Sequence, residues 1–182
     1  MKRLQISDCR LQIERQYADC RMGKSAICNL QSAIFLLMLL PGCGRKPPYE
    51  GRSVAELERM LADSDPAVQV QGAFGLSRKG AEAQPATASL IRVLNSPNAL
   101  VRQQACLALG SIGPLAAEAG PALITALADP EWTVRRQAAI ALGRIGPLAA
   151  VETPLKNCAG DPNSLVRKAA AEALTTVRKA KN

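Results

Sequence analysis

The stretch LADPEWTVRRQAAIALGRIG, residues 127–146, decides the fold of this chain because it recurs along the sequence. Moved back so that Leu127 lies over Leu94, it aligns without gaps with LNSPNALVRQQACLALGSIG at residues 94–113. A second, equal shift reaches LADSDPAVQVQGAFGLSRKG at residues 61–80, and a forward shift that is shorter by one gives DPNSLVRKAAAEAL at residues 161–174. Four copies at a near-constant period indicate a repeat architecture, in which each unit buries its apolar face against its neighbours.

Each copy predicts a helix that opens at a polar cap and ends at a glycine. The expected caps are Asp63, Ser96, Asp129 and Asp161, and a proline at the expected first helical position follows the last three. In the third copy the apolar residues recur at three- and four-residue spacing: Val134, Ala138, Ala141, Leu142 and Ile145. Gly113 and Gly146, each followed by proline, are expected to end their helices.

A second, shorter helix is expected in each copy, around residues 90–94, 123–127 and 155–158, and an earlier one over residues 53–62 opens with the capping box Ser53–Glu56. The ends of the array look different from its middle. The position of Phe74, Leu107 and Ile140, interpreted as core, becomes Glu172 in the last copy, and Gly143 becomes Thr175. We therefore predict an all-α solenoid of about four stacked hairpins, capped by residues 53–62 and 162–177.

This pattern resembles the HEAT-like repeats of the phycobilisome-lyase type over residues 53–178. The most specific element is Asp129-Pro130-x-x-x-Val134-Arg135, which Asp161-Pro162-x-x-x-Val166-Arg167 matches. The resemblance implies a structural ladder of acids and arginines between successive repeats, made by Arg102, Asp129, Arg135, Asp161 and Arg167. The alternative is a stripe of Arg102, Arg135 and Arg167 that binds phosphates.

The first fifty residues are interpreted as a targeting segment. Residues 33–40 form an uncharged apolar run too short to span a bilayer, and Leu40-Pro41-Gly42-Cys43 resembles the lipobox of bacterial lipoproteins. The resemblance implies that Cys43 becomes a lipidated N-terminus; the alternative is a buried helix that ends in a free cysteine. The expected division is an extension at 1–21, with translation from Met22 favoured over Met1, a signal peptide at 22–42, a linker at 43–52 and the repeat domain at 53–182.

The composition of the chain limits which catalytic and metal sites it can form. The chain has no histidine, which excludes His-based triads and His-ligated metals. Lys and Arg exceed Asp and Glu by 23 to 15, a net charge of +8 that favours anionic partners without naming one. Cys106 and Cys158 stand where other copies carry alanine, so we expect buried packing for both. No catalytic, cofactor-binding or metal-binding residue is predicted.

The repeat architecture predicts a non-enzymatic scaffold for other proteins, anchored by lipid at a bacterial envelope membrane. HEAT-like stacks are expected to line their concave side with the shorter helices, whose exposed positions include Arg59, Arg92, Thr125, Lys156 and Asn157. Nearby variable positions on the longer helices are Gln103, Arg136 and Lys168, and Trp132 is a candidate hot spot that alternatively covers the neighbouring hairpin. The expected partner is an acidic protein segment or an anionic headgroup. Two other functions stay open: an accessory of a bilin-lyase-like enzyme, and a cytosolic binder of anionic partners including nucleic acid, for which aromatic residues are few.

Overall fold

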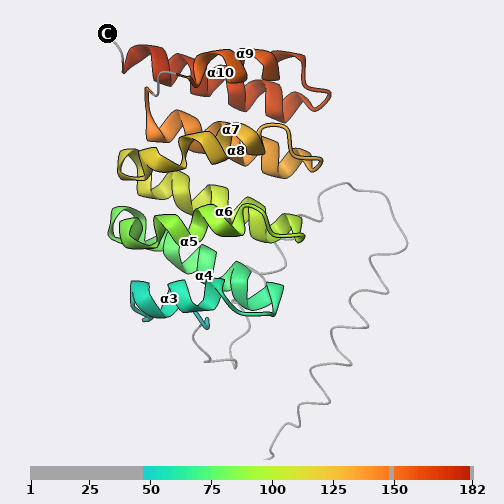
Figure 1. Ribbon diagram of the computed structural model, residues 1–182. Coiled ribbons are helices and arrows are strands. Elements are labelled where there is room, and N and C mark those ends of the chain that lie inside the picture. Colours follow the sequence, from blue (N-terminus) through green and yellow to red (C-terminus); the bar gives the residue numbers. More distant parts are fainter. Residues whose placement is uncertain (1–46, 148–149, 181–182) are drawn as a thin grey trace, which may run out of the picture. The chain divides into compact units, whose positions relative to one another are not determined.

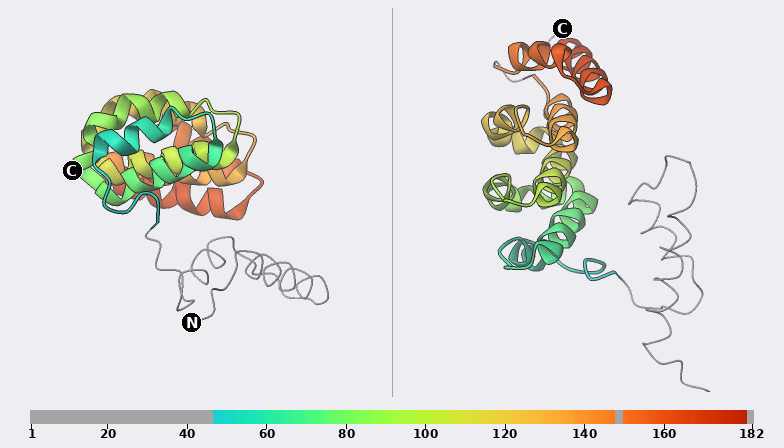
Figure 2. Two further views of the ribbon diagram at one scale, coloured as in Figure 1. Left: turned by 90° about the horizontal axis from the view of Figure 1, so that it is seen from below. Right: turned by 90° about the vertical axis from the view of Figure 1, so that its right-hand side faces the viewer.

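The structure is a computed structural model that describes residues 47–147 and 150–180, which belong to one compact unit of the chain. The expected extension, signal peptide and lipidation site at Cys43 lie outside the described residues. All regular elements in the described part are helical, and the chain forms a stack of four hairpins (Figure 1, Figure 2). The predicted all-α solenoid is confirmed.

Each hairpin pairs a shorter helix with the longer helix that follows it. The four pairs are α3 (Val54–Leu61) with α4 (Pro66–Lys79), α5 (Thr87–Val93) with α6 (Ala99–Ile112), α7 (Gly120–Ala126) with α8 (Trp132–Ile145), and α9 (Glu152–Asn157) with α10 (Ser164–Lys179). Short 3₁₀ segments, η1 (Gly80–Ala86) and η2 (Gly113–Ala119), lead from one hairpin to the next, and η3 (Cys158–Gly160) follows α9.

The longer helices form the closely packed layer of the stack. Helices α4, α6, α8 and α10 each contact the next one in this series, whereas α5, α7 and α9 make no comparable contacts with one another. In a curved stack the layer with the smaller spacing lies on the concave side. We call α4, α6, α8 and α10 the inner helices, and the expectation that the shorter helices line the concave side is wrong.

The inner helices begin later than the sequence pattern predicts. Their N-caps are Asp65, Asn98, Glu131 and Asn163. The expected caps instead accept a hydrogen bond from the N–H two positions further on, as Asp129 does from Glu131 at 2.9 Å. This local turn competes with the helix for the same side-chain oxygen, which places Pro97, Pro130 and Pro162 inside the turn and ahead of the cap.

The predicted helix ends at glycine are confirmed. Gly113 and Gly146 have φ values of 72° and 102° with extended ψ, a backbone region that is essentially restricted to glycine. A side chain at either position would resist the sharp exit of the chain toward the next hairpin.

Alanine and leucine fill the space between the two layers. Fully buried leucines recur once or twice in each hairpin: Leu57, Leu76, Leu90, Leu109, Leu123, Leu142 and Leu155. Inner helices approach so closely that a Cβ built on Gly143 would lie 2.9 Å from the Cα of Ala173, and one on Gly110 would lie 2.9 Å from the Cα of Ala141. Thr175, the residue of α10 at this register, is exposed, and no helix of the described residues packs over it.

The N-terminal end of the stack is closed by α3 and by residues just before it. Ser53 and Glu56 form the predicted capping box of α3. Tyr49, from the segment predicted to be linker, packs edge-on against Phe74 with ring centroids 5.0 Å apart. Glycines replace the alanines of other copies in α4, where a Cβ on Gly75 would lie 2.9 Å from that of Tyr49.

One stretch within the described residues, Ala99–Ala126, is long and apolar enough to cross a membrane, with a mean hydropathy of 1.4. It consists of α6, η2 and α7, which turn at Gly113 and pack into the stack. Such a stretch is equally typical of the core of a water-exposed helical protein.

Candidate interaction surface

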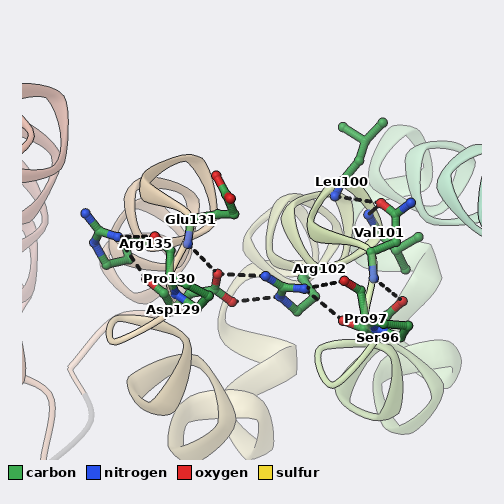
Figure 3. Close-up of polar contacts among 10 residues, drawn as sticks. Ser96, Pro97, Leu100, Val101, Arg102, Asp129, Pro130, Glu131 and Arg135 are labelled. Atoms are coloured by element: carbon green, nitrogen blue, oxygen red, sulfur yellow. Dashed lines mark hydrogen bonds and ion pairs between the residues drawn. The ribbon is translucent and has the colours of Figure 1, made fainter.

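An arginine–aspartate ladder joins the turns of successive hairpins. Arg102 donates from Nε and Nη2 to the two carboxylate oxygens of Asp129 at 2.7 and 2.8 Å, and from Nη1 to the carbonyls of Ser96 and Pro97 at 2.9 and 3.1 Å (Figure 3). Arg135 does the same one hairpin later, reaching both oxygens of Asp161 at 2.7 and 3.1 Å. Each arginine therefore ties its own turn to the next one.

The ladder changes at both ends. In the first hairpin Gln69 stands in place of arginine, and its Nε2 donates to the carbonyl of Asp63 at 2.7 Å. In the last hairpin Arg167 keeps the bonds from Nη1 to the carbonyls of Asp161 and Pro162, at 2.7 and 3.0 Å. It has no carboxylate partner among the described residues.

The side chains of the ladder are only slightly exposed, so burial and hydrogen bonds both act on the pKa values of its carboxylates. The side chains of Arg102 and Asp129 are 13% and 9% exposed. Burial alone raises the pKa of the Asp129 carboxyl, but hydrogen bonds from Arg102 and from the N–H of Glu131 outweigh it and hold that pKa below its usual value. The hydrogen bond from Arg135 likewise lowers the pKa of Asp161.

This geometry leaves little room for a phosphate-binding stripe. The Nε, Nη1 and Nη2 atoms of Arg102 and Arg135 all donate to groups of the chain itself. Arg167 differs from them, because only its Nη1 donates to the described part of the chain, and its Nε and Nη2 make no hydrogen bond there.

The residues most open to a partner lie on the outward side of the inner helices. Ile140 is half-buried and lies on the opposite side of α8 from the buried Ala138 and Leu142, as about 100° of rotation per residue requires. Phe74 and Leu107 hold the same register in α4 and α6, and both are half-buried. The row is therefore half-buried and not part of the fully buried core, although Ile140 packs against that core, and Glu172 at the same register is exposed.

Further side chains flank this row. We call the whole surface the open face, and define it by the following residues: Gln71, Phe74, Arg78, Leu100, Gln103, Gln104, Leu107, Arg136, Gln137, Ile140, Arg144, Leu165, Lys168 and Glu172. Leu100 and Leu165 are 38% and 47% exposed, high values for large apolar side chains. The open face is thus apolar along its centre and polar at its margins.

Three glutamines occupy one register of the open face. Gln71, Gln104 and Gln137 hold the same position in three successive copies of the repeat, in α4, α6 and α8. Gln71 and Gln104 are half-buried and Gln137 is 9% exposed. The Oε1 atom of Gln104 is buried and accepts no hydrogen bond within the described residues. A buried acceptor without a donor is uncommon, so this amide is poised for an additional partner.

Three of the partner-binding residues predicted from the sequence lie on the other layer, one each on the shorter helices α3, α5 and α9. Arg59 is exposed in the last turn of α3. Arg92 on α5 donates from Nη2 to the Oγ of Ser89 at 2.7 Å, and Ser89 in turn donates to Oε1 of Glu58. Lys156 on α9 lies 3.9 Å from the carboxylate of Glu152.

Trp132 is the first residue of α8 and is 37% exposed. Of the open-face residues, sequence reasoning singled out Gln103, Arg136 and Lys168 as variable positions, and it missed the apolar row and the glutamines. The sequence does indicate the outward position of this row, because a helical wheel centred on Val134 and Leu142 places residue 140 on the opposite side of the helix.

Both cysteines of the described part are buried, as expected. Burial raises the pKa of the Cys106 thiol to about 12 and also raises that of Cys158. A shallow hollow between α7 and α9 is lined by Ile124, Leu127, Pro154 and Cys158 among others. Residues 47–147 and 150–180 contain no group of three or more Cys, Asp or Glu side chains arranged to hold a metal ion.

Comparisons with known proteins agree with this architecture. The family model of HEAT repeats matches residues 54–128 and 120–181. An engineered protein solved by structural genomics is 25% identical, covers 70% of this chain and 63% of its own, and has a TM-score of 0.60. A designed armadillo-repeat protein in complex with the peptide (KR)4 is 18% identical, covers 68% of this chain and 64% of its own, and has a TM-score of 0.59. The chain spans less than two thirds of the length of these neighbours, and the comparison with curated proteins gives no match.

Proposed function

The chain belongs to the HEAT-repeat family, and we propose that it is a scaffold that holds a protein partner on its open face. HEAT and armadillo-like repeats commonly bind protein partners, and the family that matches is a structural repeat with no catalytic family identified alongside it. We therefore propose a non-enzymatic role rather than an accessory role in bilin-lyase chemistry.

The observation that carries this proposal is the half-buried row of Phe74, Leu107 and Ile140. These side chains are large and apolar, and they line the layer in which the helices pack closely into a continuous surface. Contiguous apolar surface with a polar margin is typical of protein interaction sites.

A photo-crosslinking experiment in the protein's own host tests the proposal. A benzophenone side chain replaces Leu107 on the open face, and a matched variant carries it at the exposed Thr125 of α7. We expect one discrete adduct, identified by mass spectrometry, from position 107 only, and its loss when Ile140→Glu is added.

Adducts from position 125 but not 107 would contradict the open face and would favour the shorter helices, where Arg59, Arg92 and Lys156 lie. The charge reversals Arg59→Glu and Arg92→Glu would then abolish co-purification of that partner while the helical signal stays intact. Absence of any discrete adduct from both positions would reject the scaffold proposal.

We also propose that the scaffold is a lipoprotein anchored at a bacterial envelope membrane through Cys43. The supporting observations are the apolar run at residues 33–40, the Leu40-Pro41-Gly42-Cys43 sequence and the polar segment that follows. The intact mass of the native protein after detergent phase partition tests this membrane anchoring. A detergent-phase product that begins at an acylated Cys43 is expected, and a full-length chain from Met1 or Met22 in the aqueous phase would refute it.

A further inference from the structure

We propose that the partner on the open face is an extended, acidic segment whose backbone amides bond to the glutamine row, with one apolar side chain at every third position. This inference rests on the proposed function and names the chemistry of its ligand. It follows from three features of the open face: an amide without an internal donor, the sign of the surrounding charge and the spacing of the helices.

The amide of Gln104 is the first feature. Its Oε1 has no donor among the described residues, although the side chain as a whole is half-buried. Turning the terminal amide toward solvent therefore breaks no hydrogen bond to Oε1, so Gln104 can offer that oxygen to a ligand N–H. The same amide presents N–H groups to a ligand carbonyl, which makes it a match for one peptide unit.

The glutamine row selects an extended ligand over a helical one. The backbone N–H and C=O groups of a bound α-helix are already paired within that helix. An extended segment, in particular one in the polyproline II conformation, leaves its backbone groups free. Gln71, Gln104 and Gln137 can meet such groups at three successive inner helices.

The spacing of the inner helices matches a ligand in which every third side chain points toward the open face. Packed helix axes lie about 8–10 Å apart. Polyproline II advances about 3.1 Å per residue, so one full turn of it advances about 9.3 Å. Every third side chain of such a ligand therefore reaches the same register of the next inner helix, where Phe74, Leu107 and Ile140 lie in turn.

The charge of the open face selects an acidic ligand. Its cations are Arg78, Arg136, Arg144 and Lys168, against the single anion Glu172, which lies 4.0 Å from Lys168. Arg136, Arg144 and Lys168 stand beside the α8 and α10 end of the row. Acidic residues between the apolar positions of the ligand would lie near them.

Tyr49 contacts the row at one end, from a turn of the chain and not from an extended segment. Tyr49 follows Pro47 and Pro48, and its ring packs against Phe74. The first position of the row is thereby occupied in part, which leaves Leu107 and Ile140 as the main free contacts for a partner.

Fluorescence polarisation with a labelled (Pro-Leu-Glu)5 peptide tests the inference on the full chain. We expect saturable binding, with affinity at least tenfold weaker for a peptide of the same composition in scrambled order and for the basic peptide (Lys-Arg)4. Gln104→Ala and Ile140→Glu should each weaken binding at least tenfold. Gln84→Ala, at an exposed position of η1, is the matched control and should leave binding unchanged.

The Gln104→Leu variant separates binding from folding. It removes the unpaired acceptor, so its thermal midpoint should equal or exceed that of the native chain while peptide binding is lost. Equal binding of the ordered and scrambled peptides, or binding unaffected at Gln104, would overturn the inference. A crosslinked partner at position 107 together with no binding of (Pro-Leu-Glu)5 would overturn this inference and leave the scaffold proposal standing.

Discussion

Arg102 has the same role as Arg135 but a different one from Arg167, although all three follow a valine in the repeat. The guanidinium of Arg102 satisfies a nearly buried carboxylate and two carbonyls of its own turn. Arg167 satisfies only the two carbonyls. The energetic value of the residue type therefore depends on whether a further hairpin follows.

Arg102→Ala should destabilise the protein by about 1–3 kcal/mol, because Asp129 would keep a little-exposed charge without its bidentate partner. Arg167→Ala, the matched control, should cost about 0.5 kcal/mol, as is usual for a surface position. Urea unfolding followed by circular dichroism measures both. Equal losses for the two variants would show that the bonds to the turn carbonyls, and not the ladder, determine the role of these arginines.

Acid should weaken the fold through the same carboxylates. The pKa values of Asp129 and Asp161 are lowered in the folded state, while an unfolded Asp titrates near its usual value of about 3.9. Below about pH 4 the unfolded chain takes up protons that the folded chain still excludes, so the stability that is full above this pH declines as the pH falls through the folded pKa values. Thermal midpoints measured from about pH 6 to about pH 2.5 should fall less steeply for Arg102→Ala than for the native chain; parallel curves would contradict a contribution from Asp129.

Trp132 offers an optical test of its surroundings. At 37% exposure its indole touches both the stack and water, so its emission should be red-shifted and accessible to acrylamide. As the only tryptophan of the chain, it needs no background correction. A blue emission protected from acrylamide would place the ring against the neighbouring hairpin and remove it from the candidate interface residues.

The resemblance to HEAT-like repeats predicts which acids and arginines belong together, and the repeat period brings back each partner in turn. It does not predict the N-caps. Ser96 and Asp129 are good caps by residue type, yet each forms a local turn. The N-caps of α6 and α8 are instead Asn98 and Glu131, two residues further along the chain. Two local hydrogen-bonding patterns compete here, and only the packed hairpin decides between them.

Among the elements, α6, α8 and α10 approach one another at glycines. Gly143 gives α10 direct access to the backbone of α8. Gly143→Ala should destabilise the protein by about 1–3 kcal/mol in spite of the better helix propensity of alanine, because the new Cβ would meet the backbone of Ala173. Thr175→Ala at the same register of α10 should stabilise by about 0.5 kcal/mol, since Thr175 is exposed and alanine has the better helix propensity. Thermal melts compare the two variants, and a stabilising Gly143→Ala would show that the helices can move apart freely.

The faces of the elements were harder to predict than their existence. The apolar stripe of α8 and the glycine ends follow from the sequence, since periodicity and glycine chemistry are local. Whether Ile140 faces the core or the outside depends on which neighbour covers each side of the helix, and an alternating stack covers three sides of an inner helix. The row at residue 140 is apolar and yet outward, so hydrophobicity alone assigns it to the core.

At the scale of the whole molecule, the stack is a sum of similar interfaces between neighbours. Each inner helix contacts chiefly the inner helices beside it and its own short helices and connections. Stability in such arrays is close to a sum of repeat and interface terms. One full repeat should therefore be removable without unfolding the remaining stack.

Deletion of residues 94–126, one full period, should therefore give a folded and shorter stack. The new junction joins Val93 to Leu127, which takes the register of Leu94, so the turn after α5 keeps its sequence pattern. Helix α4 would then face α8 in place of α6, its present neighbour, with Ala141 at the register of Ala108. We expect helical circular dichroism, a urea dependence reduced in proportion to the surface removed, and a lower free energy of unfolding. Deletion of residues 94–118, less than a full period, brings unlike positions together and should abolish cooperative unfolding; equal behaviour of the two deletions would contradict a stack built from interchangeable periods.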